Sequence, residues 1–410
     1  MKSKNNLSNY WYFPKRRPTD LVGNTSTISN FNKEDKEITL IFFREVIQNI
    51  LDARLDKKTS NLNVKIKLLT NRNGLKVSDL NKYCGVLDAY LKAAGHKFST
   101  HDPKNRGALV IEEFGTTGLT GKTDDAEMRE HQKEQRWNNF WNGEALEVKG
   151  STSLGRRGQG KVTKHLVSEV STVFGLSNQS TDDGKKELLM GKCIFKKTFD
   201  LENKKFLRHS FFCDKIKDRQ GEVQHIPIKS KKVIGGFKKD FQIERKEEFG
   251  TSWVIPFINT DRFTKENIIN NIVSEFYIAI INNDISLNVM NEIINSQNIE
   301  KIIKKFKIFE NDTNGFVKWS IDTIRNKANI IKLGKKWFNT TEQPANENSV
   351  LGKSLSELQR DLSKNKTITL NVPIPIKKKK EQLKYSSLKV SLKYCPNISR
   401  TEEKYVRDCL

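Results

Sequence analysis

The chain has few residues that could build a metal centre or a disulfide framework. Its five cysteines include no Cys-x-x-Cys pair, and its six histidines include no His-Glu-x-x-His motif. Structural zinc sites and secreted disulfide folds depend on closely spaced ligands of these types. We therefore expect reduced thiols and no zinc site built by the protein.

Long apolar segments are also missing. The apolar run Ile38–Phe43 is far shorter than the about 20 residues that a transmembrane helix requires. The first residues, Met1–Asn6, are polar and lack the apolar core of a signal peptide. We expect a cytoplasmic protein with no membrane partner.

Acidic residues are outnumbered. The formal net charge is +24, from 73 Lys and Arg against 49 Asp and Glu. Such a surplus favours a polyanionic partner, nucleic acid first. The chain is also rich in asparagine and isoleucine, so part of the lysine excess reflects a general composition bias. The charge thus supports DNA binding without locating it, in a chain of 410 residues that is long enough for two or three domains.

A helix predicted over about residues 33–54 carries the first functional pattern. Its polar residues Glu45, Asn49 and Asp52 are spaced i, i+4 and i+7, which places them on one face. Apolar residues occupy the other sides of the helix. A solvated polar stripe explains this pattern as well as a functional one does. The functional alternative is a metal ion with a polyphosphate, since buried carboxylates need a partner.

Two glycine segments follow this helix. Residues 109–119, LVIEEFGTTGL, form an apolar strand that runs into two glutamates and a pair of glycines. Residues 155–161, GRRGQGK, are a second glycine box that opens a helical segment. In this order, the three segments resemble the GHKL ATPases, the superfamily of gyrase, heat-shock chaperones, histidine kinases and MutL. The helix string E-x-x-x-N-x-x-D-A is most similar to the MutL and MORC branch. The resemblance covers about residues 30–260.

The resemblance implies a Bergerat-type two-layer α/β sandwich with a mixed sheet. The ATP-binding domain would span residues 33–260, with an ATP lid at about 119–161. Residues 1–32 would be an arm that either reaches a partner subunit or packs on its own domain. Residues 261–340 would form a mostly helical connection. Residues 341–410 would form a smaller, transducer-like α/β domain, which we expect to be incomplete.

The resemblance also implies the site residues and the cofactors, ATP and Mg²⁺. Glu45 would be the catalytic base, and Asn49 would give Mg²⁺ a neutral oxygen ligand. Glu113 would accept a hydrogen bond from adenine, although the family has Asp in an Asp-x-Gly-x-Gly pattern and this chain has one extra residue between the glycines. The implied nucleotide-binding residues are Asn49, Asp52, Glu113, Gly115, Gly118, Leu119, Gly155, Arg157, Gly158, Gln159, Gly160, Lys161 and Thr251.

A P-loop is the rival interpretation of the second glycine box. Gly155-x4-Gly160-Lys161 matches most of a Walker A motif. The next residue is Val162, so the hydroxyl that should bind Mg²⁺ is missing. The polar residues 149–153 also make a poor buried strand, and we favour the GHKL interpretation.

The resemblance implies an ATPase whose nucleotide-dependent homodimerisation acts as a clamp or switch on DNA. Such proteins are similar to components of anti-phage defence systems, which would supply a partner protein. The alternatives are a chaperone-like ATPase that acts on protein clients and a non-hydrolysing ATP-binding switch. The lysine run Lys377–Lys380 would be a γ-phosphate sensor, a DNA contact or a solvated cluster.

Overall fold

The chain folds into two compact units, residues 1–308 and residues 309–408. The computed structural model describes these parts of the chain: 7–17, 35–55, 61–100, 107–123, 135–142, 160–181, 184–217, 221–312, 315–326, 330–333, 355–376 and 384–394. Both units combine helices with a sheet, which confirms the predicted α/β class.

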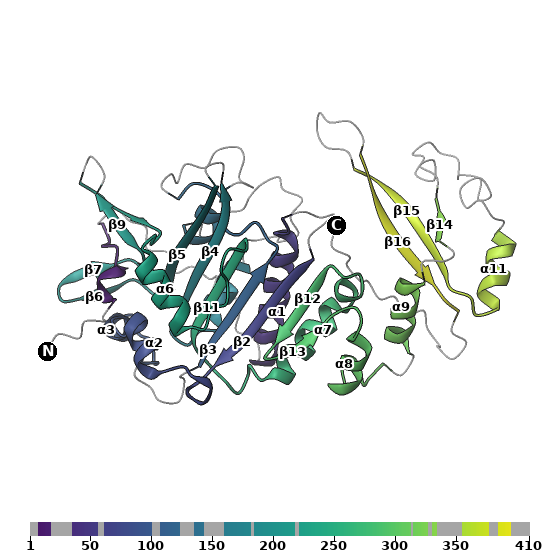
Figure 1. Ribbon diagram of the computed structural model, residues 1–410, viewed down its shortest axis with the longest axis horizontal. Coiled ribbons are helices and arrows are strands. Elements are labelled where there is room, and N and C mark those ends of the chain that lie inside the picture. The colour runs from purple at the N-terminus through teal and green to yellow at the C-terminus, as the bar shows by residue number, and fades with distance from the viewer. Residues whose placement is uncertain are drawn as a thin grey trace. The chain divides into compact units, whose positions relative to one another are not determined.

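The larger unit is built on a nine-stranded mixed sheet with the strand order β1-β8-β5-β4-β11-β3-β2-β12-β13 (Figure 1). Its described pairs are antiparallel except β2 with β12. Two small hairpins, β6–β7 and β9–β10, stand outside it. The strands are β1 (Trp11–Tyr12), β2 (Leu62–Leu69), β3 (Gly107–Phe114), β4 (Thr172–Thr181), β5 (Gly184–Ile194), β6 (Phe199–Leu201), β7 (Lys204–Phe206), β8 (His209–Phe212), β9 (Asp214–Lys217), β10 (Val223–Ile226), β11 (Gly250–Ile258), β12 (Ile285–Val289) and β13 (Glu292–Ile294).

Strands β3 and β11 lie at the centre of the sheet and are buried along nearly their whole length. Alternation along a strand sends successive side chains to opposite faces. On β3, Val110 joins the core on one face, whereas Ile111 points to the other. On β11, Val254 joins the same core as Val110, and Trp253 points to the opposite face.

Helices α2 (Val77–Cys84), α3 (Leu87–Ala93) and α6 (Lys231–Asp240) cover the face that Val110 and Val254 share (Figure 1). This finding corrects the predicted two-layer sandwich, because helices lie on both faces. The physical reason is that the segment of residues 75–105 makes amphipathic helices, whose apolar side chains need an apolar surface to cover.

The opposite face carries α1 (Asp35–Asp52), α4 (Arg136–Trp141), α5 (Gly160–Leu166) and α7 (Lys265–Ile281). Helix α1 packs between α5 and α7. Its rings Phe42 and Phe43 are fully buried and both contact Phe263. None of the described helices is long and apolar enough to cross a membrane.

The predicted domain boundary at residue 260 is corrected. Strand β12 runs parallel to β2, with Ile285 opposite Leu62, and α7 packs on α1. The short helix α8 (Ile299–Lys305) packs on α7. Residues 261–308 therefore complete the first unit instead of linking two domains, since the edge of β2 needs a hydrogen-bonding partner.

The described part of the N-terminal arm packs on its own unit. Trp11 pairs with Phe212 through β1 and β8, and its indole N–H donates to the Tyr83 carbonyl at 2.6 Å. Only 4 % of this tryptophan is exposed. Residues 7–17 thus follow the second alternative, an arm held by its own domain.

The smaller unit has a three-stranded sheet in the order β14-β15-β16, flanked by helices α9 and α11. Strand β14 is parallel to β15, and β16 is antiparallel to it. The unit begins at Phe309 instead of the predicted residue 341, and Lys377–Lys380 lie outside the described residues. The elements are α9 (Phe316–Arg325), β14 (Ile330–Lys332), α11 (Leu355–Ser363), β15 (Ile368–Ile376) and β16 (Lys384–Leu392).

Candidate functional site

Two of the predicted site residues are cross-strand neighbours. Strands β3 and β11 pair with Glu112 opposite Ser252, so the next positions, Glu113 and Thr251, share the other face. Both side chains are buried, and the Glu113 carboxylate accepts hydrogen bonds from Thr251 and Trp253. A carboxylate and a hydroxyl are therefore presented side by side on the face that α1 covers.

The glycine turn after β3 is joined to the end of α1. Gly115 and Gly118 have φ values of 83° and 67°, which favour glycine. The backbone N–H of Leu55 donates to the Gly115 carbonyl at 3.0 Å, and that of Thr117 donates to the Ala53 carbonyl at 2.9 Å. These bonds fix the end of α1 against the end of β3.

The turn then crosses to β4. The backbone N–H of Leu119 donates to Ser177 Oγ at 2.8 Å, and Ser177 Oγ lies 3.4 Å from the Thr251 hydroxyl. A Cβ at Gly118 would stand only 2.7 Å from the carbonyl oxygen of Asn178. Glycine is required at this position both for its φ and for this close approach.

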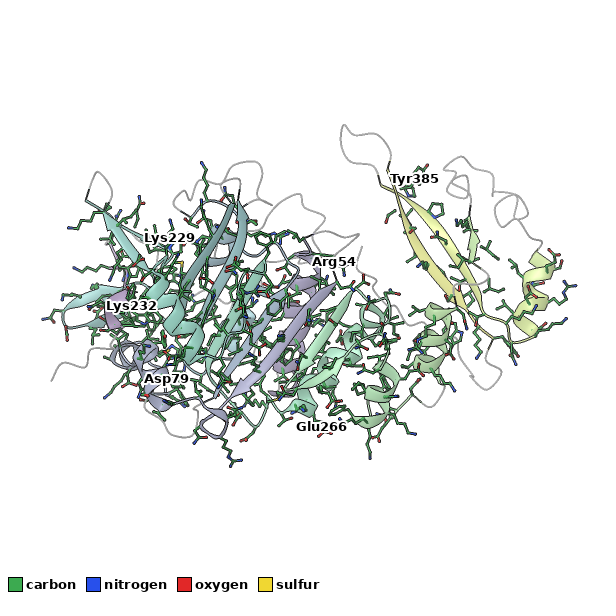
Figure 2. All side chains as sticks on the ribbon, in the orientation of Figure 1. Arg54, Asp79, Lys229, Lys232, Glu266 and Tyr385 are labelled. Atoms are coloured by element: carbon green, nitrogen blue, oxygen red, sulfur yellow. The ribbon has the colours of Figure 1, made fainter. Side chains whose placement is uncertain are left out.

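The polar stripe of α1 is only partly buried. Glu45 is half-buried, whereas Asn49 and Asp52 are exposed. Gln48 Nε2 donates to Asp52 Oδ1 at 3.4 Å. Next to the stripe, Arg54 pairs with Asp284 at 3.1 Å and fixes the end of α1 to β12 (Figure 2). The exposure of Asn49 and Asp52 agrees with both alternatives for this helix.

Lys164 is a charged residue of the site that no sequence motif indicates. Helix α5 places its side chain on the sheet, where 4 % of the residue is exposed. Its Nζ lies 4.8 Å from the ring centroid of Trp253 and 5.6 Å from that of Phe140. Burial lowers the pKa of Lys164 to about 8, while the negative charges of Glu113 and Glu45 act in the opposite direction.

Arg136 is a second basic residue that sequence reasoning missed. Its guanidinium donates to Thr117 Oγ1 at 2.8 Å and to the Asp52 carbonyl at 3.4 Å. It thus connects the glycine turn, the end of α1 and helix α4. Burial lowers its pKa, and the charges of Glu113 and Asp52 oppose that effect. Residues 135–142 of the predicted lid therefore pack on the site.

A charged network lies on the opposite face of the sheet, behind Glu113 and Thr251. The guanidinium of Arg245 donates to the backbone carbonyls of both residues and to Ser252 Oγ. Glu112 is fully buried and accepts from the backbone N–H of Arg245 at 3.1 Å. Gly250 permits this close packing, since a Cβ there would collide with the Glu113 carbonyl. The network holds the two strand ends at a fixed separation.

The second glycine box is only partly described. Gly155, Arg157, Gly158 and Gln159 lie outside the described residues, and Gly160 and Lys161 open α5. The strand after α5, β4, is antiparallel to both of its neighbours, β5 and β11. The P-loop fold instead places its strands in a parallel sheet, so this arrangement disfavours the P-loop interpretation.

Among the described residues, no group of three or more His, Cys, Asp or Glu could hold a metal ion. Asn49, as a single exposed amide, suits a Mg²⁺ ion whose other ligands are phosphate oxygens and water. No protein-family model matches the sequence, and no curated protein matches it significantly.

Proposed function

We propose that this chain is an ATP-binding protein of the GHKL type, with a Bergerat-type fold in its larger unit. The observation that carries the proposal is the junction of three segments predicted separately. The end of α1, the glycine turn 115–118 and the pair Glu113–Thr251 meet at one end of the sheet. A solvated helix with no function would not require this junction.

In this proposal Glu113 and Thr251 recognise the base. The carboxylate of Glu113 accepts the exocyclic amine hydrogen of adenine, and the hydroxyl of Thr251 contacts the same edge. Burial raises the pKa of Glu113 above its ordinary value, and an incoming N–H donor would favour its charged form. Glutamate has a longer arm than the aspartate of the family, so this chain would hold the base about one carbon further from β3.

Hydrolysis in this proposal takes place beside α1. Glu45 orients a water molecule and accepts its proton as the oxygen attacks the γ-phosphorus, and the bond to ADP breaks to release phosphate. Asn49 and phosphate oxygens would hold Mg²⁺, which would neutralise the developing charge. The half-buried position of Glu45 and the exposure of Asn49 suit a carboxylate that meets water and an amide that meets a hydrated ion.

The wider role belongs to the same proposal. Nucleotide-dependent dimerisation would close the protein as a clamp or switch on DNA, in a cytoplasmic anti-phage system with a partner protein. The net charge of +24 supports a polyanionic partner. It favours the DNA clamp over a chaperone, which would act on protein clients.

The test compares Glu45→Ala and Asn49→Ala with the wild type in steady-state phosphate release and in binding of a non-hydrolysable ATP analogue. We expect Glu45→Ala to lower turnover by about 100-fold or more, because proton transfer is lost, and to leave affinity nearly unchanged. Asn49→Ala should weaken Mg²⁺-dependent binding itself. Glu266→Ala is the control, since Glu266 is exposed at the start of α7, far from Arg54 in Figure 2.

Near-normal turnover in Glu45→Ala would reject the catalytic assignment. Tight nucleotide binding without any turnover in the wild type would favour the non-hydrolysing switch. DNA binding measured across salt concentrations, with and without the analogue, separates the clamp from the chaperone, because only the clamp should gain salt-sensitive DNA affinity with nucleotide.

A further inference from the structure

Helix α6 carries a basic surface that the proposed nucleotide site does not use. The segment of residues 227–241, PIKSKKVIGGFKKDF, contains five lysines and a single acidic residue. The helix packs on the core through Ile234 and Phe237, on the face of the sheet that α1 does not cover (Figure 1). Its exposed lysines are Lys231, Lys232 and Lys239. The outer surface of α6 is therefore strongly basic.

The acidic groups beside α6 already have partners inside the protein. Asp240 accepts from Lys82 Nζ at 2.6 Å and from the Tyr83 hydroxyl at 2.9 Å. Glu187 pairs with Lys238. Within the described ranges, none of the three exposed lysines of α6 forms an ion pair. A polyanion would therefore bind them without breaking an existing ion pair.

A glycine lies in the middle of these lysines. On a helix surface, the neighbours of a residue are three and four positions away. Gly235 is exposed, and a Cβ there would have no other atom within 4 Å, so the packing does not require glycine. A glycine inside a helix is destabilising relative to alanine. Its absence of a side chain instead permits a partner to approach the helix backbone closely. The four helix neighbours of Gly235 are all lysines: Lys231, Lys232, Lys238 and Lys239.

The first turn of α6 also has an unfavourable charge. Ser230 caps the helix by accepting from the backbone N–H of Val233 at 3.5 Å, and Lys231 and Lys232 follow the cap. The first turn of a helix carries partial positive charge, so cations there are unfavourable, and no acidic residue of this turn offsets them. Bound phosphate groups would relieve this repulsion.

The chemistry of the surface indicates which polyanion it fits. A helix that binds an anionic membrane inserts its apolar face into the lipid, but α6 already buries Ile234 and Phe237 in the core. Its exposed residues include no aromatic ring or amide that could read a base. From Lys231 to Lys239 the helix rises about 12 Å. This length matches three to four phosphates of a DNA strand, which rises about 3.4 Å per phosphate.

We propose that the outer surface of α6, from Lys231 to Lys239, contacts the phosphate backbone of double-stranded DNA independently of base sequence. This inference rests on the DNA role within the proposed function and assigns a surface to it. Because α1 lies on the other face of the sheet, nucleotide binding and DNA contact would depend on separate residues. The alternative is a solvated lysine surface in a lysine-rich chain.

The first experiment measures binding of two duplexes of unrelated sequence by fluorescence anisotropy across salt concentrations. In the double variant Lys231→Gln/Lys239→Gln, the slope of log affinity against log salt should fall by about two, since each lost phosphate contact removes about 0.9. Both duplexes should be weakened equally. The matched control is Lys301→Gln/Lys304→Gln, which removes two exposed lysines from α8 of the same unit and should leave the slope unchanged.

The second experiment uses Gly235→Leu, which adds a side chain without hydrogen-bonding groups to the exposed helix surface. Leucine is a better helix former than glycine, so the melting temperature should rise by about 1–3 °C. DNA affinity should nevertheless fall, because the side chain holds phosphates away from the backbone. A solvated surface would gain the stability and keep its affinity. Binding of a non-hydrolysable ATP analogue should be unchanged in every α6 variant.

Equal DNA affinity and salt slope in the wild type and the α6 variants, or an equal loss in the α8 control, would overturn this inference alone. Loss of binding to phosphatidylserine vesicles with DNA binding intact would also overturn it, in favour of a membrane. A folded wild type that binds no duplex at low salt would remove the DNA role of the proposed function, and this inference with it. DNA binding through α6 in a chain that binds no nucleotide would support the inference and reject the ATP site.

Discussion

Glu112 and Glu113 are neighbours in β3, yet the two faces of the sheet treat them differently. Glu112 is fully buried and accepts hydrogen bonds from the backbone N–H groups of Glu244 and Arg245, both at 3.1 Å, and from Ser252 Oγ at 3.2 Å. Lys67 adds an ion pair at 3.3 Å. On the other face, burial raises the pKa of the Glu113 carboxyl, while the positive charges of Arg245 and Lys164 act in the opposite direction.

The two faces differ in how the chain stabilises a buried carboxylate. At Glu112 the chain itself satisfies the buried charge, so no ligand is needed there. Around Glu244, at the rim of this network, hydrogen bonds from Lys65 and Lys67 lower the pKa of the Glu244 carboxyl to about 2. At Glu113 and Lys164 burial shifts the pKa of each group towards its neutral form, and groups with strongly shifted pKa values are concentrated at functional sites.

The largest effect on stability should come from a substitution in the charged network around Glu112. Arg245→Met should lower the free energy of unfolding by about 3–5 kcal/mol, because it removes the buried guanidinium that donates to the Glu113 and Thr251 carbonyls and to Ser252 Oγ. Urea denaturation measures the change. Arg17→Met is the control, since the ion pair of Arg17 with Glu222 at 3.1 Å is exposed and should contribute about 1 kcal/mol or less. Similar losses in both variants would contradict the comparison.

Removal of the charge of Lys164, on the other face of the sheet, should raise the free energy of unfolding. The folded pKa of Lys164, about 8, is below its ordinary value of 10.5, so the wild type gains stability as pH rises from about 8 to 10.5. Lys164→Met removes this penalty and should stabilise the ligand-free protein at pH 7 by an amount on the order of 3 kcal/mol.

The pH dependence provides the measurement. Urea midpoints of the wild type and Lys164→Met should converge as the pH rises above 10.5, the ordinary pKa of the lysine, where the lysine becomes neutral in both states. The charged groups that act on Lys164 are Glu113 from β3 and Glu45 from α1. A variant less stable than the wild type at pH 7 would show that the ammonium is satisfied in the folded chain.

The smallest expected effects on stability come from replacing Glu112 or Glu113 by glutamine. This comparison is the sharpest, because the same chemical change is made at two adjacent residues. Glu112→Gln should destabilise the protein by about 1.5–3 kcal/mol, since it weakens charged hydrogen bonds. Glu113→Gln should leave stability at pH 7 unchanged or raised. The folded pKa of Glu113 is raised, so its ionised form lowers stability as pH rises above the ordinary value of 4.5.

Thermal unfolding of the two glutamine variants at pH 7 and pH 4 tests this pair. Near pH 4 the difference between Glu113→Gln and the wild type should shrink, because the wild-type carboxyl is then largely protonated in both states. If both variants lose the same stability at pH 7, the two faces are equivalent and the assignment of a binding face loses its main support.

Local patterns in the sequence were sufficient for several of the helices and strands. The spacing of Glu45, Asn49 and Asp52 predicted a helix, and α1 covers it. The apolar run before Glu113 predicted a strand, which is β3, and the positive φ of Gly115 and Gly118 is in keeping with the glycines of the turn. These features depend on residues within a few positions of one another, so periodicity and glycine placement are enough to indicate them.

Contacts between distant segments were decided by the tertiary structure alone. Lysine is so common in this chain that nothing in the sequence distinguishes Lys164, and only the packing of α5 on the sheet buries it. The pairing of Glu113 with Thr251 depends on the register of β3 and β11, and the domain boundary depends on β12 reaching β2. Burial and strand register follow from which surfaces meet, a property of the whole fold that no local run of residues encodes.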